Sequence, residues 1–228
     1  MENKMQDNFT YNDNAEIEKV KLFGYDWFLQ KYFKTTTSGP FTYFHLKNEG
    51  FGEFYISKNA LDSIKKEEEY KLLSLIYEQN INDKNLYYSI TLSEEKDKLQ
   101  WKYDNYISLS VEEIFSRFPS DFIEIQQRAL INIYKQYPNY GQEVELINNY
   151  IFFVKNNSEL FFILNSMKNK NWINVNTRKM IGGEFIFTEL IINDNGWLEI
   201  EKTIKKNRKK QVFIAMKFKD MDNVYDSI

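Results

Sequence analysis

Three aromatic-rich runs near the start of the chain constrain its fold most. They are Leu22–Phe33, Phe41–Leu46 and Phe51–Ile56, and the turn-like segments Thr35–Pro40 and Lys47–Gly50 separate them. Short runs of aromatic and β-branched residues between turn residues are typical of neighbouring strands joined by hairpins. We therefore expect a small antiparallel meander. Core packing explains the aromatic clustering more simply than a base-stacking or nucleotide pocket does.

A helix and two further strands are expected after the meander. Asn59 is placed to cap a helix from Ala60 to about Asn80, in which apolar residues recur at helical spacing. Tyr87–Leu92 and Leu99–Tyr106 carry strand residues on either side of a charged turn. This pattern predicts a hairpin.

A second folded region is expected after Phe118-Pro119-Ser120, because proline ends the preceding element and Ser120 can cap a new helix. Its expected elements are the helices Ser120–Gln136 and Asn157 to about Lys168, the hairpin strands Trp172–Asn176 and Glu184–Ile192, and a closing helix capped by Asn193 or Asp194. The buried stripe of the second helix is expected to be Leu160, Phe161, Leu164 and Met167. Helix, helix, hairpin and helix is a winged-helix-like order.

The residue composition changes near the end of the chain. A basic run, Lys205–Lys210, leads into the apolar run Val212–Met216. An uninterrupted apolar run bounded by charge predicts a strand buried on both faces of a parallel sheet. Asp220–Ile228 can begin the next helix, so we expect the incomplete start of an α/β, Rossmann-like domain.

These patterns predict an α+β chain of four segments. They are a disordered tail (1–16), an α+β domain with a small antiparallel sheet (17–118), a winged-helix-like domain (119–206), and a basic linker with the first strand and helix start of a truncated α/β domain (207–228).

The succession of residues in the last third resembles a known family. Ile191-Ile192-Asn193-Asp194-Asn195-Gly196-Trp197 and the basic run through Lys210 precede Val212-Phe213-Ile214-Ala215-Met216-Lys217-Phe218 and Met221-Asp222-Asn223-Val224-Tyr225. This order resembles a bacterial family of largely uncharacterised proteins that pair a winged-helix-like region with a domain similar to TIR and nucleoside 2-deoxyribosyltransferase folds. The resemblance covers roughly residues 119–228.

The resemblance implies a sensor that controls an enzyme cleaving a nucleotide N-glycosidic bond, in several members suspected of anti-phage defence. It places the start of a nucleotide pocket at Ala215, Met216, Lys217 and Phe218. The family's catalytic carboxylate would follow Ile228, so no catalytic residue is carried over. No cofactor is expected in this chain, and NAD or a nucleotide only in a longer form. Lys217 departs from the family, which commonly has proline or a bulky residue there.

The residue composition limits the kinds of catalytic and metal site that the chain can form. The chain has no cysteine and one histidine, His45, which excludes disulfides, thiolate nucleophiles and the Cys-x-x-Cys zinc ribbon that relatives often carry. We expect no metal site, and we expect His45 to be a structural histidine in a strand. The pairs Glu112/Glu113 and Glu143/Glu145 are expected to be surface charge. With no apolar leader region and no apolar run of about 18 residues, a cytosolic location without membrane contact is expected.

Nucleic-acid binding is the alternative function. The net charge of −3 argues against broad capture of nucleic acid, although a local basic face is compatible with it. The residues that would contact phosphate are Lys168, Lys170, Arg178, Lys179, Lys205, Lys206, Arg208, Lys209 and Lys210. The second helix, however, presents Phe161 and Phe162 where a recognition helix would be polar, and a basic run usually forms a solvated linker.

The sequence therefore predicts the sensor or regulatory region of a bacterial defence protein, with a nucleic-acid-binding winged-helix regulator as the alternative. An intact glycosidic-bond enzyme would need a longer chain. The expected partner is an unidentified trigger or protein, or a second copy of the chain.

Overall fold

A computed structural model describes residues 17–36, 39–98, 105–144, 149–179 and 185–206. The chain is a mixed α+β protein that divides into two compact units. Unit 1 comprises the described residues up to Ser120 together with Phe153–Lys155, and unit 2 comprises Asp121–Phe152 and the residues from Asn156 onward. The expected tail (1–16) and the expected truncated domain (207–228) lie outside the described residues.

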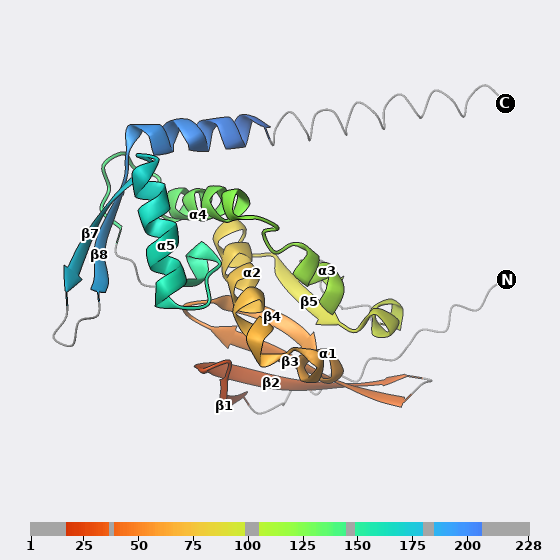
Figure 1. Cartoon of the computed structure of the whole chain (residues 1–228). Coiled ribbons are helices and arrows are strands. Elements are labelled where there is room, and N and C mark those ends of the chain that lie inside the picture. Colours follow the sequence, from red (N-terminus) through yellow and green to blue (C-terminus); the bar gives the residue numbers. More distant parts are fainter. Residues whose placement is uncertain (1–16, 37–38, 99–104, 145–148, 180–184, 207–228) are drawn as a thin grey trace, which may run out of the picture. The chain divides into compact units, whose positions relative to one another are not determined.

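Unit 1 is built on a six-stranded sheet whose strands lie in chain order (Figure 1). The strands are β1 Ile17–Leu22, β2 Tyr25–Thr36, β3 Gly39–Asn48, β4 Gly52–Ser57, β5 Tyr87–Thr91 and β6 Tyr106–Ser110. The antiparallel pairing of β2, β3 and β4 confirms the predicted meander, and β1 adds an antiparallel strand that was not predicted.

The predicted hairpin after the meander is wrong. β5 pairs with β6 in parallel, from Tyr87 opposite Tyr106 to Thr91 opposite Ser110. β5 is also parallel to β4, so the sheet is mixed rather than antiparallel. Parallel neighbours need a crossover connection, and the charged stretch interpreted as a tight turn is part of one, the 3-10 helix Ser93–Lys98.

The single helix predicted from Ala60 to about Asn80 is also wrong. It is divided into α1 (Lys58–Ser63) and α2 (Glu69–Asn82), with a 3-10 turn (Lys66–Glu68) between them. Ile64 and Lys65 have extended backbone angles, which ends α1 before the charged run begins. The cap of α1 is Ser57, whose hydroxyl accepts the Ala60 N–H, and not Asn59.

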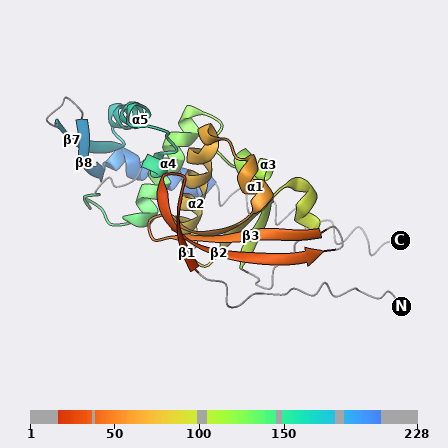
Figure 2. The same cartoon turned by 90° about the horizontal axis from the view of Figure 1, so that it is seen from below.

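A further short helix, α3 (Val111–Ser116), follows β6 and was not predicted. Ser110 and Glu113 form a capping box at its start. Figure 2, seen from below, shows α1 and α2 on the same side of β2 and β3, so these helices cover one face of the sheet.

The core of unit 1 lies between the sheet and its helices. Trp27 stacks on Phe51 at 5.7 Å and meets Phe54 edge-on at 5.5 Å. The fully buried side chains include Trp27, Leu46, Phe54, Ile56, Leu72, Leu75, Ile76, Ile90 and Ile114. Each such side chain contributes about 1.5–3 kcal/mol when it is buried. Part of the aromatic clustering is therefore core packing, as predicted.

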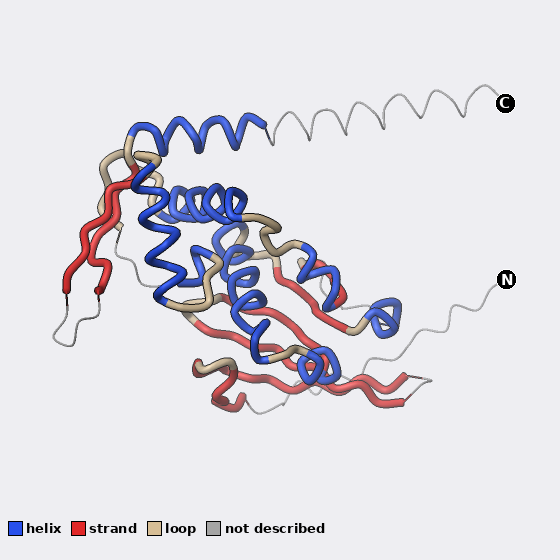
Figure 3. The backbone as a smooth tube through the Cα atoms, in the orientation of Figure 1, coloured by secondary structure: helices blue, strands red, loops and turns tan. Residues whose placement is uncertain are grey.

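The helices and strands of unit 2 follow the predicted order, and a 3-10 turn that was not predicted lies between the first two helices (Figure 3). They are α4 Phe122–Gln136, the 3-10 turn Asn149–Phe152, α5 Asn157–Asn169, β7 Ile173–Lys179, β8 Phe185–Ile192 and a last helix over residues 194–206. The cap of α4 is Asp121 rather than Ser120. The antiparallel pairing of β7 and β8 confirms the hairpin, although Thr177–Lys179, expected in the turn, belong to β7.

The buried stripe of α5 differs from the prediction at one residue. The buried residues of α5 are Leu160, Ile163, Leu164 and Met167, so the prediction that Phe161 lies in the stripe is wrong. Phe161 is 41% exposed and Phe162 is 63% exposed.

None of the helices among the described residues combines the length and apolar character that crossing a bilayer requires.

Candidate ligand-binding site

The face of the sheet opposite the helices of unit 1 carries polar and aromatic side chains. Leu46 is opposite Phe54, and Phe54 is opposite Tyr88, so these three residues share the core face. Side chains alternate along a strand, and the intervening residues therefore share the other face. We call this face of β3, β4 and β5 the polar face: Tyr43, His45, Lys47, Glu53, Tyr55, Ser57, Tyr87, Ser89 and Thr91.

His45 and Glu53 contact each other on the polar face. Nε2 of His45 lies 3.2 Å from Oε2 of Glu53, and Nζ of Lys47 lies 3.7 Å from the same oxygen. The side chains of His45 and Glu53 are 19% and 17% exposed, so solvent reaches both in part. An ionised carboxylate only accepts hydrogen bonds, so Nε2 carries the proton and Nδ1 of the neutral ring is an acceptor.

The pKa of His45 lies below its usual value, because burial disfavours the imidazolium form. The carboxylate of Glu53 opposes this effect, and Lys47 adds to it. His45 is therefore neutral at pH 7. The Nδ1 acceptor is available at this pH, and within the described residues no hydrogen bond to Nδ1 is formed.

Two tyrosines complete the site. The ring of Tyr55 stacks on the imidazole of His45 with centroids 4.4 Å apart and planes 11° from parallel. The hydrogen bond between the hydroxyl of Tyr87 and Glu53 raises the pKa of Tyr87 to about 12. Both phenol and imidazole are thus neutral groups held in place by a single carboxylate. The site presents flat rings together with hydrogen-bonding groups.

A buried carboxylate lies at the other end of the polar face. Glu95 is 2% exposed and accepts hydrogen bonds from Oγ of Ser57 at 2.6 Å, Nδ2 of Asn59 at 2.7 Å and the N–H of Leu92 at 3.1 Å. The pKa of Tyr43 is raised, first by burial and then by the charge of Glu95. Three donors satisfy the carboxylate, so Glu95 ties the β5–β6 connection to the start of α1.

Sequence reasoning missed Glu95 because it lies in a charged stretch that looked like a solvated turn. No periodicity or motif marks it, since its partners are up to 38 positions away. His45 was singled out as a structural histidine in a strand; it lies on β3, and its Nε2 contacts Glu53. Its pairing with Tyr55 and Glu53 is a consequence of the β3–β4 register.

Among the carboxylates singled out in the sequence as surface charge, Glu113 has structural contacts. Glu113 caps α3 and lies 2.6 Å from Nζ of Lys96. Hydrogen bonds from Lys96 and from the backbone of Ser110 keep the pKa of Glu113 below its usual value. Glu143 is exposed, and Glu145 lies outside the described residues.

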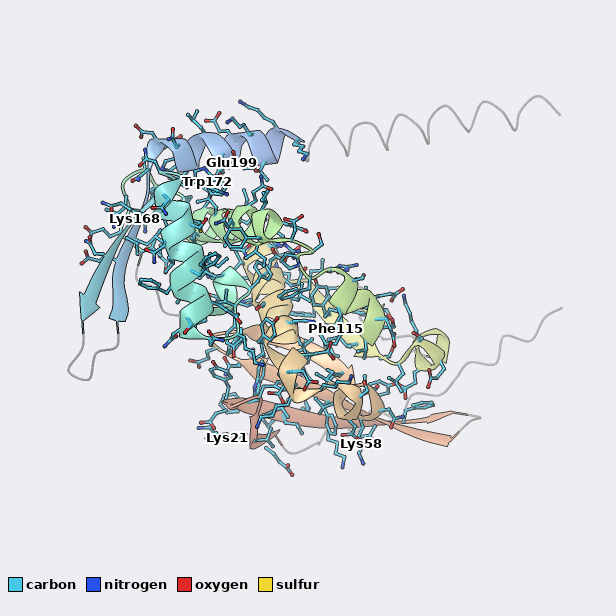
Figure 4. All side chains as sticks on the ribbon, in the orientation of Figure 1. Lys21, Lys58, Phe115, Lys168, Trp172 and Glu199 are labelled. Carbon is cyan, nitrogen blue, oxygen red and sulfur yellow. The ribbon has the colours of Figure 1, made fainter. Side chains whose placement is uncertain are left out.

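The predicted nucleic-acid contacts in unit 2 are partly engaged within the unit. Nζ of Lys170 donates to Oε1 of Gln126 and lies 4.4 Å from the centroid of the Trp172 ring. Nζ of Lys168 lies 3.5 Å from the carbonyl oxygen of Val175. Figure 4 labels Lys168 on α5 and Trp172 just before β7.

The remaining predicted residues are dispersed. Lys205 pairs with Glu201 at 3.2 Å on the last helix. Lys206 lines a groove of about 560 Å³ together with Asp121, Glu124 and Glu199, so this surface carries both signs of charge. Arg178 and Lys179 lie on β7. Arg208, Lys209, Lys210, Ala215, Met216, Lys217 and Phe218 lie outside the described residues.

The described residues do not bring three side chains of His, Cys, Asp or Glu together as a metal site. Comparison of the chain with models of protein families, with curated proteins and with solved structures finds no match.

Proposed function

We propose that this chain is a recognition region, in which unit 1 binds a planar heterocyclic ligand on the polar face of its sheet. The observation that carries the proposal is the arrangement of His45, Glu53 and Tyr55. Glu53 orients the neutral imidazole, and Tyr55 stacks on it. Such a ligand would donate an N–H or O–H to Nδ1 and place its ring against the neighbouring aromatic rings.

Binding accounts for this arrangement better than proton transfer does. The carboxylate of Glu53 already interacts with His45, Lys47 and Tyr87, so it is a poor general base. The raised pKa of Tyr87 keeps its phenol protonated at pH 7. Groups held in fixed protonation states suit the orientation of a ligand.

The family resemblance extends the proposal. By that resemblance, binding in unit 1 would control a TIR-like or deoxyribosyltransferase-like effector domain in a cytosolic bacterial defence protein. A ligand signal can reach an effector only if the two effector states bind the ligand with different affinity. In this proposal the ligand binds on the polar face, and its binding shifts the equilibrium between the two effector states.

The proposal is tested with the one histidine of the chain as a spectroscopic probe. The ¹⁵N signals of His45 are followed while adenosine, guanosine, cytidine and uridine are added in turn to the full chain. We expect at least one nucleoside to shift Nδ1 more than Nε2, because Nε2 remains bonded to Glu53. His45→Phe keeps an aromatic ring beside Tyr55 and should abolish binding, measured by calorimetry.

Absence of binding by all four nucleosides at their solubility limits would overturn the proposed ligand class. Binding that is unchanged in His45→Phe would move the ligand away from the polar face. Glu49→Gln, an exposed change in the turn before β4, serves as the control variant and should bind as the unmodified chain does.

A further inference from the structure

A small cavity in unit 2 lies beside the start of the last helix. Its volume is about 390 Å³, and its lining includes Tyr140, Asn171, Asn193, Asp194 and Trp197. Sites that bind small molecules usually have volumes of about 300–1,000 Å³ and combine aromatic walls with a few polar groups. The cavity has both properties, and its lining contains none of the residues of the polar face or of the predicted nucleic-acid contact.

A tight turn holds the aromatic wall of this cavity in place. The N–H of Gln142 lies 3.3 Å from the carbonyl oxygen of Asn139, and Gly141 has a φ of +70°, a left-handed angle that glycine adopts without steric cost. The ring of Tyr140, within this turn, lies on the indole of Trp197, with centroids 4.3 Å apart and planes 46° from parallel. Tyr140 is nevertheless 77% exposed, so most of its ring remains accessible to a ligand.

The neighbouring contacts fix the rest of the wall. Tyr134 meets the indole of Trp197 edge-on, with centroids 5.6 Å apart. Nδ2 of Asn193 donates to Oδ1 of Asn171 at 2.9 Å, and the N–H of Asn193 donates to the carbonyl oxygen of Trp172, also at 2.9 Å. The aromatic and the amide side of the cavity are therefore both formed before a ligand arrives.

The charge of the cavity is negative. Asp194 is the one charged residue among those that line it. Asp194 is exposed, and its side chain forms no ion pair or hydrogen bond within the described residues. The N-terminus of a helix carries about half a positive charge, and the full negative charge of the Asp194 carboxylate exceeds it. The cavity therefore disfavours an anion.

The aromatic rings and the carboxylate favour the same class of ligand. The faces of tyrosine and tryptophan rings attract cations, and tryptophan does so most strongly. A methylated ammonium fits better than a primary one, because it brings no N–H groups that would be left without acceptors against the rings. We propose that this cavity binds a methylated ammonium group, with the cation on the exposed face of Tyr140 and Trp197 and with Asp194 balancing its charge. The site lies within unit 2 and is independent of the ligand proposed for the polar face.

The test compares choline with its uncharged analogue, in which a tert-butyl group replaces the trimethylammonium. Each is added to the full chain at constant ionic strength while the ¹⁵N–H signals of the tryptophan indoles are recorded. Trp197→Phe identifies the signal of Trp197. Ethanolamine, which has a primary ammonium, tests the need for the methyl groups. Melting curves verify that each variant remains folded.

We expect choline to shift the Trp197 signal and to bind at least about threefold more tightly than the tert-butyl analogue. Asp194→Asn should weaken choline binding about threefold and leave the analogue unaffected. Tyr140→Leu should weaken both ligands, whereas Tyr140→Phe keeps the ring and should bind as the unmodified chain does. Glu143→Gln removes an exposed carboxylate that does not line the cavity, and it is the matched control.

A peptide that carries trimethyllysine identifies the source of the group. Tighter binding of the peptide than of choline would assign the site to a protein side chain, and tighter binding of choline would assign it to a free small molecule. Either result supports a methylated ammonium as the ligand.

The inference is overturned if choline does not shift the Trp197 signal, or if choline and its tert-butyl analogue bind equally. Ethanolamine binding as tightly as choline would exclude the methylated group. A choline affinity unchanged in both Asp194→Asn and Tyr140→Leu would place the cation elsewhere. His45→Phe should bind choline normally, and loss of choline binding in this variant would contradict a site in unit 2.

Discussion

His45 and Tyr55 are direct cross-strand partners on β3 and β4, and their rings lie 4.4 Å apart and nearly parallel. Glu53, two residues before Tyr55 on β4, bonds the same imidazole through Nε2. One strand therefore supplies both the ring that stacks on the histidine and the carboxylate that orients it. This geometry makes the properties of His45 depend on a small number of testable contacts.

Glu53→Gln should lower the pKa of both His45 and Tyr87. The carboxylate stabilises the imidazolium of His45 and hydrogen-bonds the neutral phenol of Tyr87, and the amide does neither as well. Titrations of the histidine ¹⁵N signals and of the tyrosine absorbance measure the two shifts. Glu49→Gln is the control, and a pKa of Tyr87 that stays near 12 in Glu53→Gln would contradict the described contact.

The stability of the chain should fall as the pH falls through the normal histidine range. The pKa of His45 is depressed in the folded state, so the unfolded chain binds a proton first. The contribution of His45 is complete above a pH of about 6.5 and is lost as the pH falls toward and below the folded pKa. Urea unfolding at a series of pH values between about 5 and 8 measures this slope.

His45→Phe removes the titrating group and retains a ring beside Tyr55. Its free energy of unfolding should change less with pH across the same interval, in which carboxylates titrate little. Equal slopes for the variant and the unmodified chain would show that His45 does not titrate differently in the folded and unfolded states.

Glu95→Ala should destabilise the chain by about 3 kcal/mol, because it leaves the buried donors of Ser57, Asn59 and Leu92 without their acceptor. Denaturant unfolding measures the loss. Glu95→Gln keeps one acceptor oxygen and should cost less. Glu94→Ala, an exposed neighbour, should change stability by less than about 0.5 kcal/mol, and equal effects at the two positions would contradict the buried network.

Gly196→Ala should destabilise the chain by about 3 kcal/mol. An added Cβ would lie 2.1 Å from the backbone oxygen of Trp172 and 2.8 Å from Cγ2 of Ile192, so the last helix would have to move away from the hairpin. Thermal unfolding measures the effect. Asn195→Ala, an exposed neighbour on the same helix, is the control. A stabilised Gly196→Ala, as expected for an unhindered helical site, would contradict this close packing.

Local signals were sufficient for much of unit 2 and for the meander of unit 1. The apolar spacing of Ser120–Gln136 and the proline after it predicted α4 to within one or two residues. Aromatic runs between turn residues predicted β2, β3 and β4. These features depend on contacts within a few residues, or on hairpins whose strands are adjacent in the sequence, so the sequence pattern contains them.

Only the tertiary structure decided how distant segments meet. The residue pattern of Tyr87–Leu92 predicted a strand. It did not predict the parallel pairing with β4 and β6, because the pattern of a buried strand specifies neither its partner nor its direction. The burial of Glu95 depends on Ser57, 38 positions earlier, and a charged residue is expected at the surface unless such a partner exists. The sequence determined the strands and helices that could form, and the packing of the sheet determined which of their polar side chains share the candidate site.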